Sequence, residues 1–222
     1  MEVGKIVRPP KTLIEGFRNL ATSTIGNVLD DLQIQGTIQN IKPISPGFRF
    51  VGGAFTVKEI TGVQGTYTNE DFKLGEVIDS AQEGDVIVID NGGQQVSTWG
   101  GIASLAAQIR GVAGLVVDGG VRDLDEIREF NFPVFSRYVV PTSGKSRVKI
   151  LAIHTVIKID GVRVRPGDIV VGDGTGVVCI PIGVAEEVMT TAQRLDQQDK
   201  QAIEEIRRGL SFTEALRKFA KI

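Results

Sequence analysis

The chain has 222 residues, of which 41% are hydrophobic and 23% charged, a composition ordinary for a water-soluble globular protein. Its 25 basic and 27 acidic side chains leave a formal charge of −2, so charge alone indicates neither a nucleic-acid nor a membrane partner. Cys179 is the only cysteine, which excludes an intramolecular disulfide and favours a reducing compartment. No segment resembles a secretion signal or a membrane span, so we expect a soluble cytoplasmic protein.

The first predicted elements are two consecutive helices. Residues 12–33 place apolar side chains at helical spacing, and the Ser-Thr pair at 23–24 divides this stretch into two helices. Thr22 or Ser23 is expected to cap the second of them.

Strands and helices then alternate along the chain. The elements expected are a strand-like run at 44–60, a helical segment at 70–82, a buried strand at 83–90, a helix at 97–109 opened by Ser97 and Thr98, a strand at 112–118, a helix at 123–130 and a strand at 133–140. The alternation from 83 to 140 predicts successive βαβ units and an α/β fold with at least three parallel strands.

The pattern changes after Pro141, where short β-type runs follow one another closely. Asp-Gly pairs at 160–161 and 173–174 favour hairpins, so this part is expected to be antiparallel or mixed. From residue 182 to the end the sequence is helical, and these solvent-rich helices are expected to pack on a neighbouring subunit. Because no linker is visible, residues 1–222 are assigned to a single domain.

The first candidate site is Arg122-Asp123, which follows the strand-like run that ends at Asp118. Ligands of α/β folds gather outside the carboxyl ends of strands. A guanidinium there can bind a substrate carboxylate, and the neighbouring aspartate can ligate a hard cation that polarises a carbonyl. The alternative is structural, because Asp123 and Glu126 form a D-x-x-E capping box that would only begin the next helix.

The second candidate lies in residues 89–104, where a helix begins near Gly100 and Gly101. A helix start offers unpaired N–H groups to a carboxylate or phosphate, and glycine lets the ligand approach the backbone. The alternative is that the two glycines only permit tight packing of the helix on the sheet. Both candidates leave neighbouring predicted strands on one side of the sheet, so they are expected to face each other.

Several familiar motifs are absent. The sequence contains no G-x-G-x-x-G after a first strand, no P-loop and no G-x-S-x-G elbow. One histidine and one cysteine do not make a zinc motif. These absences argue against a dinucleotide-dependent oxidoreductase, a P-loop nucleotidase and an α/β-hydrolase.

Three segments together resemble a known family. They are TSTIGNVLDDL at 22–32, VVDGGVRDLDEI at 116–127 with its upstream Trp-Gly-Gly helix start, and RPGDIVVGDGTGVVCIP at 165–181. The family contains the regulator of ribonuclease activity A and the 4-hydroxy-4-methyl-2-oxoglutarate (4-carboxy-4-hydroxy-2-oxoadipate) aldolases, formerly labelled demethylmenaquinone methyltransferases. The resemblance implies a swivelling, phosphohistidine-domain-like α/β/β/α sandwich with mixed sheets, assembled as a homotrimer or hexamer.

The resemblance also implies roles for particular residues. Asp123 would hold Mg²⁺ or Mn²⁺, and Arg122 would contact the keto-acid end of the substrate. The backbone amides that would bind the substrate carboxylate belong to Gly100, Gly101, Ile102 and Ala103. The implied reactions are retro-aldol cleavage of a 4-hydroxy-2-oxoacid to pyruvate and decarboxylation of oxaloacetate, which share an enolate of pyruvate.

The sequence departs from this family at one position. The family's aldolases carry an acidic residue where this chain has Gly101, and a second acidic residue from a neighbouring subunit corresponds to Asp199. On the resemblance as a whole, the leading hypothesis is a metal-dependent lyase acting on 2-keto acids. The alternatives are a non-catalytic regulator that binds a ribonuclease or another RNA-processing enzyme, and a carboxylate-binding protein without chemistry.

Overall fold

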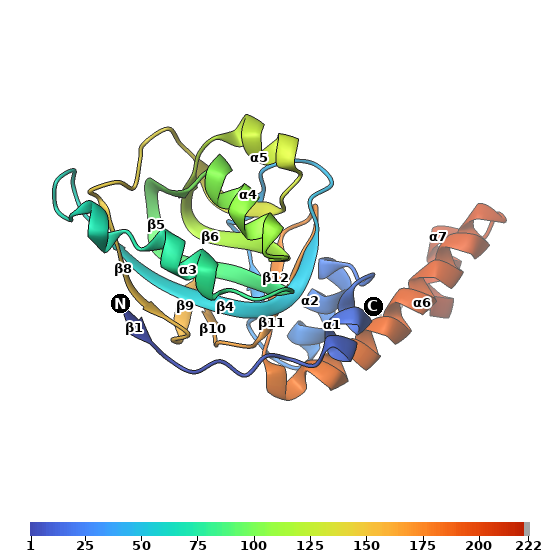
Figure 1. Cartoon of the computed structure of the whole chain (residues 1–222). Helices are drawn as coiled ribbons and strands as arrows, with labels where there is room; N and C mark the ends of the chain where they lie inside the picture. The colour runs from blue at the N-terminus through green and yellow to red at the C-terminus, as the bar shows by residue number, and fades with distance from the viewer. Residues whose placement is uncertain (220–222) are drawn as a thin grey trace.

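The computed structural model describes residues 1–219, which form a mixed α/β fold (Figure 1). The strands are β1 (Glu2–Val3), β2 (Thr37–Ile38), β3 (Lys42–Pro43), β4 (Phe50–Thr61), β5 (Asp85–Trp99), β6 (Gly114–Val121), β7 (Val134–Val139), β8 (Val148–Ile153), β9 (Ile157–Ile159), β10 (Val162–Val164), β11 (Ile169–Gly172) and β12 (Val177–Ile180). The α-helices are α1 (Lys11–Phe17), α2 (Thr22–Asp31), α3 (Leu74–Ser80), α4 (Gly101–Ile109), α5 (Leu124–Phe130), α6 (Ala185–Arg207) and α7 (Phe212–Phe219). Two short 3₁₀ turns, η1 and η2, span Asn69–Asp71 and Ile182–Val184.

Four parallel strands form the middle of a ten-stranded sheet, in the order β4-β5-β6-β7. Their β-branched runs are buried on both faces, which is the usual pattern of a parallel sheet covered by other elements. Ile89, for example, pairs with Val57 on one side and Val117 on the other, and all three side chains are buried. The expectation of at least three parallel strands is confirmed.

Antiparallel strands complete the sheet beside β4. The first half of β4 pairs with β11 and its second half pairs with β8. The Asp-Gly pair at 160–161 turns β9 into β10, and residues 173–176 turn β11 into β12, so both expected hairpins are present. The mixed sheet and the α/β class predicted from the sequence are confirmed.

Two hydrophobic cores lie on opposite faces of β11 and β12. Val170 contributes to the core beneath α3, α4 and α5, whereas its neighbours Ile169 and Val171 contribute to the core that α1, α2 and α6 cover. This alternation follows from the two-residue period of a strand. The two groups of helices therefore enclose the sheet from both sides.

The C-terminal helices extend away from this body. In Figure 1, α6 begins against α1 and α2, and its later turns project outward to α7. Residues 220–222, the end of the C-terminal segment expected to be helical, lie outside the described residues. Within residues 1–219, no helix is both long and apolar enough to cross a lipid bilayer.

One strand is longer than the sequence predicts. The expected strand at 83–90 continues as β5 to Trp99, so Ser97 and Thr98 belong to the strand and do not open a helix. Gly92 and Gly93 adopt positive φ angles, a conformation that glycine accepts readily. They bend the strand, which then resumes pairing with β6 in a shifted register. Helix α4 begins only at Gly101.

The start of α2 also differs from the prediction. The break between the first two helices falls before Thr22, and neither Thr22 nor Ser23 caps α2 with its side chain. Asp173 in the β11–β12 turn caps α2 instead, because its carboxylate accepts hydrogen bonds from the Thr22 amide at 2.8 Å and from the Thr22 hydroxyl at 2.7 Å. A cap supplied from 151 residues away is invisible to a local reading of the sequence.

Candidate functional site

A pocket of about 340 Å³ lies at the carboxyl ends of β5 and β6, beside α3 and α4. The predicted site residues that line it are Gly100, Ile102, Ala103, Arg122 and Asp123. The other lining residues are Phe72, Leu74, Gly75, Ile78, Ser97, Thr98, Trp99, Ala106, Ser143 and Gly144. The two segments that the sequence expected to face each other therefore share one pocket.

Asp123 holds an unusual backbone conformation at the edge of this pocket. Its φ of 58° and ψ of 46° are left-handed, which is uncommon for a residue other than glycine and is tolerated better by Asp and Asn. Its side chain makes no capping hydrogen bond to α5, so the capping-box interpretation is wrong. The carboxylate instead accepts the Gly101 N–H at Oδ2 over 3.2 Å. Within residues 1–219, Oδ1 accepts no hydrogen bond and stays available to a ligand.

Arg122 lies directly beside this carboxylate. Its Nε is 3.5 Å from Oδ2 of Asp123, and its side chain is 44% exposed. The Arg122 amide donates to the Trp99 carbonyl at 3.0 Å, which fixes the backbone of the pair against the end of β5. The guanidinium keeps most of its donors free, so it can bind a carboxylate in the pocket.

The first turn of α4 supplies backbone donors to the same pocket. The first N–H groups of a helix have no intrahelical acceptor. Here the Gly101 N–H is taken by Asp123, whereas those of Ile102 and Ala103 make no hydrogen bond to the described residues. A Cβ on Gly100 would overlap Oδ2 of Asp123, so the glycine leaves room for the carboxylate in its present position.

Gly101 itself does not line the pocket, and the side chain of Glu126 lies directly beside its Cα. A Cβ on Gly101 would meet Oε2 of Glu126 at 1.9 Å and the Glu126 Cβ at 2.8 Å. The Glu126 side chain, from the first turn of α5, therefore occupies the space that a side chain at position 101 would need.

The donor set suits one kind of metal ion. Within residues 1–219, no three His, Cys, Asp or Glu side chains come together as a metal cage. Mg²⁺ usually keeps several waters and binds through one or two carboxylates together with its substrate. Asp123, with a free carboxylate oxygen at a pocket wall, fits that mode of binding.

A buried carboxyl group behind the pocket was not predicted from the sequence. Glu59 in β4 is 1% exposed, and Oε1 accepts a 2.6 Å hydrogen bond from the hydroxyl of Thr98, a residue of the pocket wall. Its Oε2 has no partner within residues 1–219. Burial raises the pKa of Glu59 to about 8. The available signal was periodicity, because Glu59 falls on the same face of β4 as buried Phe55 and Val57.

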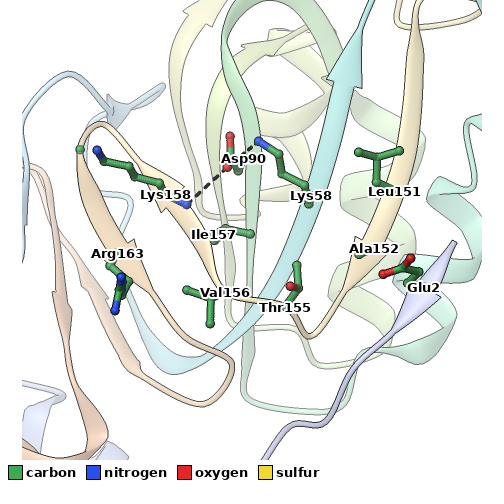
Figure 2. Close-up of a pocket in the computed structure, with 11 residues that line it drawn as sticks. Glu2, Lys58, Asp90, Leu151, Ala152, Thr155, Val156, Ile157, Lys158 and Arg163 are labelled. Carbon is green, nitrogen blue, oxygen red and sulfur yellow. Dashed lines mark hydrogen bonds and ion pairs between the residues drawn. The ribbon is translucent and has the colours of Figure 1, made fainter.

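A wider pocket of about 850 Å³ lies elsewhere on the molecule (Figure 2). Lys58 on β4 forms an ion pair with Asp90 on the neighbouring strand β5, with Nζ 2.8 Å from Oδ2. Lys158 and Arg163 stand on the opposite side of the view, on the hairpin of β9 and β10. None of the predicted site residues lines this pocket.

Asp199 does not join the site within its own chain. It is an exposed residue of α6, the helix that projects from the body of the molecule, and it does not line the pocket of Asp123. Its assignment to a neighbouring subunit's site stays a prediction.

Known proteins are similar to this chain in sequence and in fold. Residues 22–179 match the family model described as RraA-like, Aldolase/RraA. The chain is 35% identical over 188 residues to a Halalkalibacterium halodurans protein named "Putative 4-hydroxy-4-methyl-2-oxoglutarate aldolase", covering 84% of this chain and 85% of that protein. It is also 35% identical over 190 residues, or 84% of the chain, to protein DlpA of Legionella pneumophila subsp. pneumophila, of whose length it spans 30%.

A solved structure agrees with these matches. Streptomyces coelicolor RraAS2, described as an unusual member of the RNase ES inhibitor RraA protein family, superposes with a TM-score of 0.77 and 26% identity. The match covers 93% of this chain and 100% of that one. Sequence, family model and fold agree, and the chain belongs to the RraA-like family of aldolases and RraA proteins.

Proposed function

We propose that the protein is a divalent-metal-dependent carbon–carbon lyase acting on 2-keto acids, by retro-aldol cleavage of a 4-hydroxy-2-oxoacid, decarboxylation of oxaloacetate, or both. The observation that carries this proposal is the arrangement of Arg122 and Asp123 opposite the free amides of α4 in one pocket. The aldolase name of a relative with 35% identity supports the same reaction class.

The geometry of the pocket supports a role for each of these residues. Arg122 and the amides of Ile102 and Ala103 bind the carboxylate of the keto acid, because together they offer a guanidinium and a helix N-terminus. Asp123 would hold Mg²⁺ or Mn²⁺, because one of its carboxylate oxygens accepts no hydrogen bond from residues 1–219. When bound, such an ion acts as a Lewis acid that polarises the keto oxygen.

The protein prepares the site before substrate arrives. The Gly101 N–H and the Arg122 side chain position the Asp123 carboxylate beside the first turn of α4. Apolar side chains from α3 and the segment before it, Phe72, Leu74 and Ile78, form one wall of the pocket.

The test is pyruvate formation from oxaloacetate and from 4-hydroxy-2-oxoacids with Mg²⁺, Mn²⁺ or Co²⁺. Replacing Asp123 by Asn removes the ligand charge, and we expect turnover to fall more than about 100-fold. Asp125→Asn is the matched control, because Asp125 is a fully exposed carboxylate on α5 and should leave turnover unchanged. A wild-type protein that is inert with every metal would refute the lyase proposal.

A second candidate function is regulation of an RNA-processing enzyme without catalysis. The name of RraAS2 as a member of an RNase ES inhibitor family favours it, and so does the glycine at position 101. Under this proposal the protein would bind a purified ribonuclease stoichiometrically, and Asp123→Asn would leave that binding unchanged. The lyase proposal predicts instead that the protein has lyase activity and that Asp123→Asn abolishes most of it.

A further inference from the structure

We propose that Glu59 is the group that stores a proton beside this pocket. The Thr98 hydroxyl transfers this proton to the carbon of the pyruvate enolate that loses its bond in the C–C cleavage. The inference rests on the proposed function, because it assigns the protonation step of the same reaction. The site needs a proton donor, and the glycine at position 101 has no side chain that could act as one.

The path runs through a single buried contact. Thr98 belongs to the pocket wall, is 1% exposed and is 2.6 Å from the Glu59 carboxyl group. A hydroxyl both donates and accepts, so it can pass a proton on without moving. With the proton on Oε1 of Glu59, this contact reverses, and the Thr98 hydrogen is free to point into the pocket.

The surroundings of Glu59 keep it protonated at neutral pH. Its pKa is raised to about 8, first because burial disfavours the carboxylate and next because Asp90 on β5 repels its negative charge. The hydrogen bond from Thr98 and the charge of Lys58 act in the opposite sense. Lys58 is paired with Asp90 at 2.8 Å, so it does not neutralise Glu59 through a direct contact.

A structural role does not explain the arrangement. An unpaired buried polar atom costs free energy, and Oε2 has no partner within residues 1–219. An apolar side chain would fill this layer of the sheet at lower cost. A group poised to titrate near neutral pH beside a pocket is typical of general acids and bases.

The step balances. When the C–C bond of oxaloacetate breaks, carbon dioxide leaves and the electron pair remains as the enolate of pyruvate. Carbon 3 takes the hydroxyl proton of Thr98, and the Thr98 oxygen takes the proton of Glu59. The Glu59 carboxylate then recovers a proton from water through Thr98 once pyruvate has left.

The reverse of this step gives a direct test. Exchange of the pyruvate methyl hydrogens with heavy water, followed by proton NMR in the presence of Mg²⁺, needs the proton-holding group but no cleavage of a C–C bond. We expect Glu59→Gln and Thr98→Val to slow exchange about 100-fold or more, with a smaller loss of oxaloacetate cleavage. We also expect wild-type exchange to rise as pH passes about 8, and this rise to disappear in Glu59→Gln.

Matched variants separate this role from packing. Thr98→Ser keeps a hydroxyl and should restore exchange. Thr56→Val removes another buried hydroxyl, one that donates to the Thr155 carbonyl away from the pocket, and should leave exchange unchanged. If exchange and cleavage fall by equal factors in Glu59→Gln and Thr98→Val, or neither falls, Glu59 is not the proton-holding group. A wild-type protein inert in both assays overturns the proposed function and this inference with it.

A readout besides activity checks the titration of Glu59. Because its folded pKa exceeds its ordinary value of 4.5, the wild type is favoured at low pH and loses this stability as pH rises toward about 8. Glu59→Gln does not titrate, so its free energy of unfolding relative to wild type should increase over that range. A difference that does not change with pH would mean that Glu59 is charged throughout, which overturns the inference.

Discussion

At the scale of single residues, Gly100 decides whether the carboxylate of Asp123 can hold its position. The Gly100 φ of −155° is ordinary extended backbone, so alanine is permitted there by conformation and excluded only by the contact of 2.3 Å with Oδ2. We expect Gly100→Ala to fold, to displace the carboxylate and to weaken Mn²⁺ binding about tenfold or more, measured by electron paramagnetic resonance.

Gly75 provides the control for this substitution. It also lines the pocket, yet a Cβ there would meet nothing within 4 Å. Gly75 lies in α3, where alanine is the better helix former, so Gly75→Ala should keep Mn²⁺ affinity. Equal affinity in both variants would show that the position of the Asp123 carboxylate does not govern metal binding.

At the scale of elements, the Asp173 carboxylate joins the β11–β12 turn to the start of α2. Its hydrogen bonds with Thr22 and with the amides of its own turn lower the pKa of Asp173, against the opposing effect of burial. We expect Asp173→Ala to reduce the free energy of unfolding by about 1–2 kcal/mol, measured by urea denaturation. Because the folded pKa lies below 3.8, this stabilisation is present above that pH and is lost as pH falls further.

An exposed aspartate distinguishes the cap from a general effect of charge. Asp79 in α3 is 79% exposed and 3.6 Å from Arg110, so Asp79→Ala should change stability by less than about 0.5 kcal/mol. If the two variants lose the same stability, the contact between Asp173 and Thr22 does not stabilise α2.

The elements that the sequence predicts well are those whose reasons are local. The β-branched runs around Val88 and Val116 predict buried parallel strands, and the Asp-Gly pairs predict both hairpins. The errors have distant causes. The end of β5 depends on pairing with β6 beyond Gly93, and the start of α2 depends on Asp173.

The candidate site likewise has parts that the local sequence predicts and parts that it does not. Arg122 and Asp123 stand out in the sequence because a charged pair follows a strand and two glycines. The left-handed backbone of Asp123 cannot be read from its neighbours, so the sequence left the capping box open. Glu59 went unnoticed because its side chain is buried against groups distant in the sequence, such as Thr98, and not against the residues adjacent to it.

At the scale of the whole molecule, the projecting helices expose large apolar side chains. Ile203 is 48% exposed, Ile206 is 40% exposed and Phe212 is 68% exposed. Apolar surface of this kind is typical of protein contacts. We expect light scattering to show a trimer or hexamer. The double substitution Ile203→Glu and Phe212→Glu should lower the measured mass of the assembly toward that of a single chain.

Val63 is the control for that experiment. It is 81% exposed in the loop after β4, so Val63→Glu adds the same charge away from the projecting helices and should leave the mass unchanged. A wild-type protein that stays monomeric at micromolar concentration would contradict the expected assembly.

The position of β4 has a consequence for biosynthesis. This strand leaves the ribosome early, yet it lies between β5 and a partner, β11, made more than 100 residues later. One edge of the first half of β4 therefore waits without its final neighbour for most of translation, which exposes unpaired backbone to the crowded cell. At a synthesis rate of about 5–20 residues per second, this interval lasts about 5–25 seconds, and any dependence on chaperones is expected to arise during it.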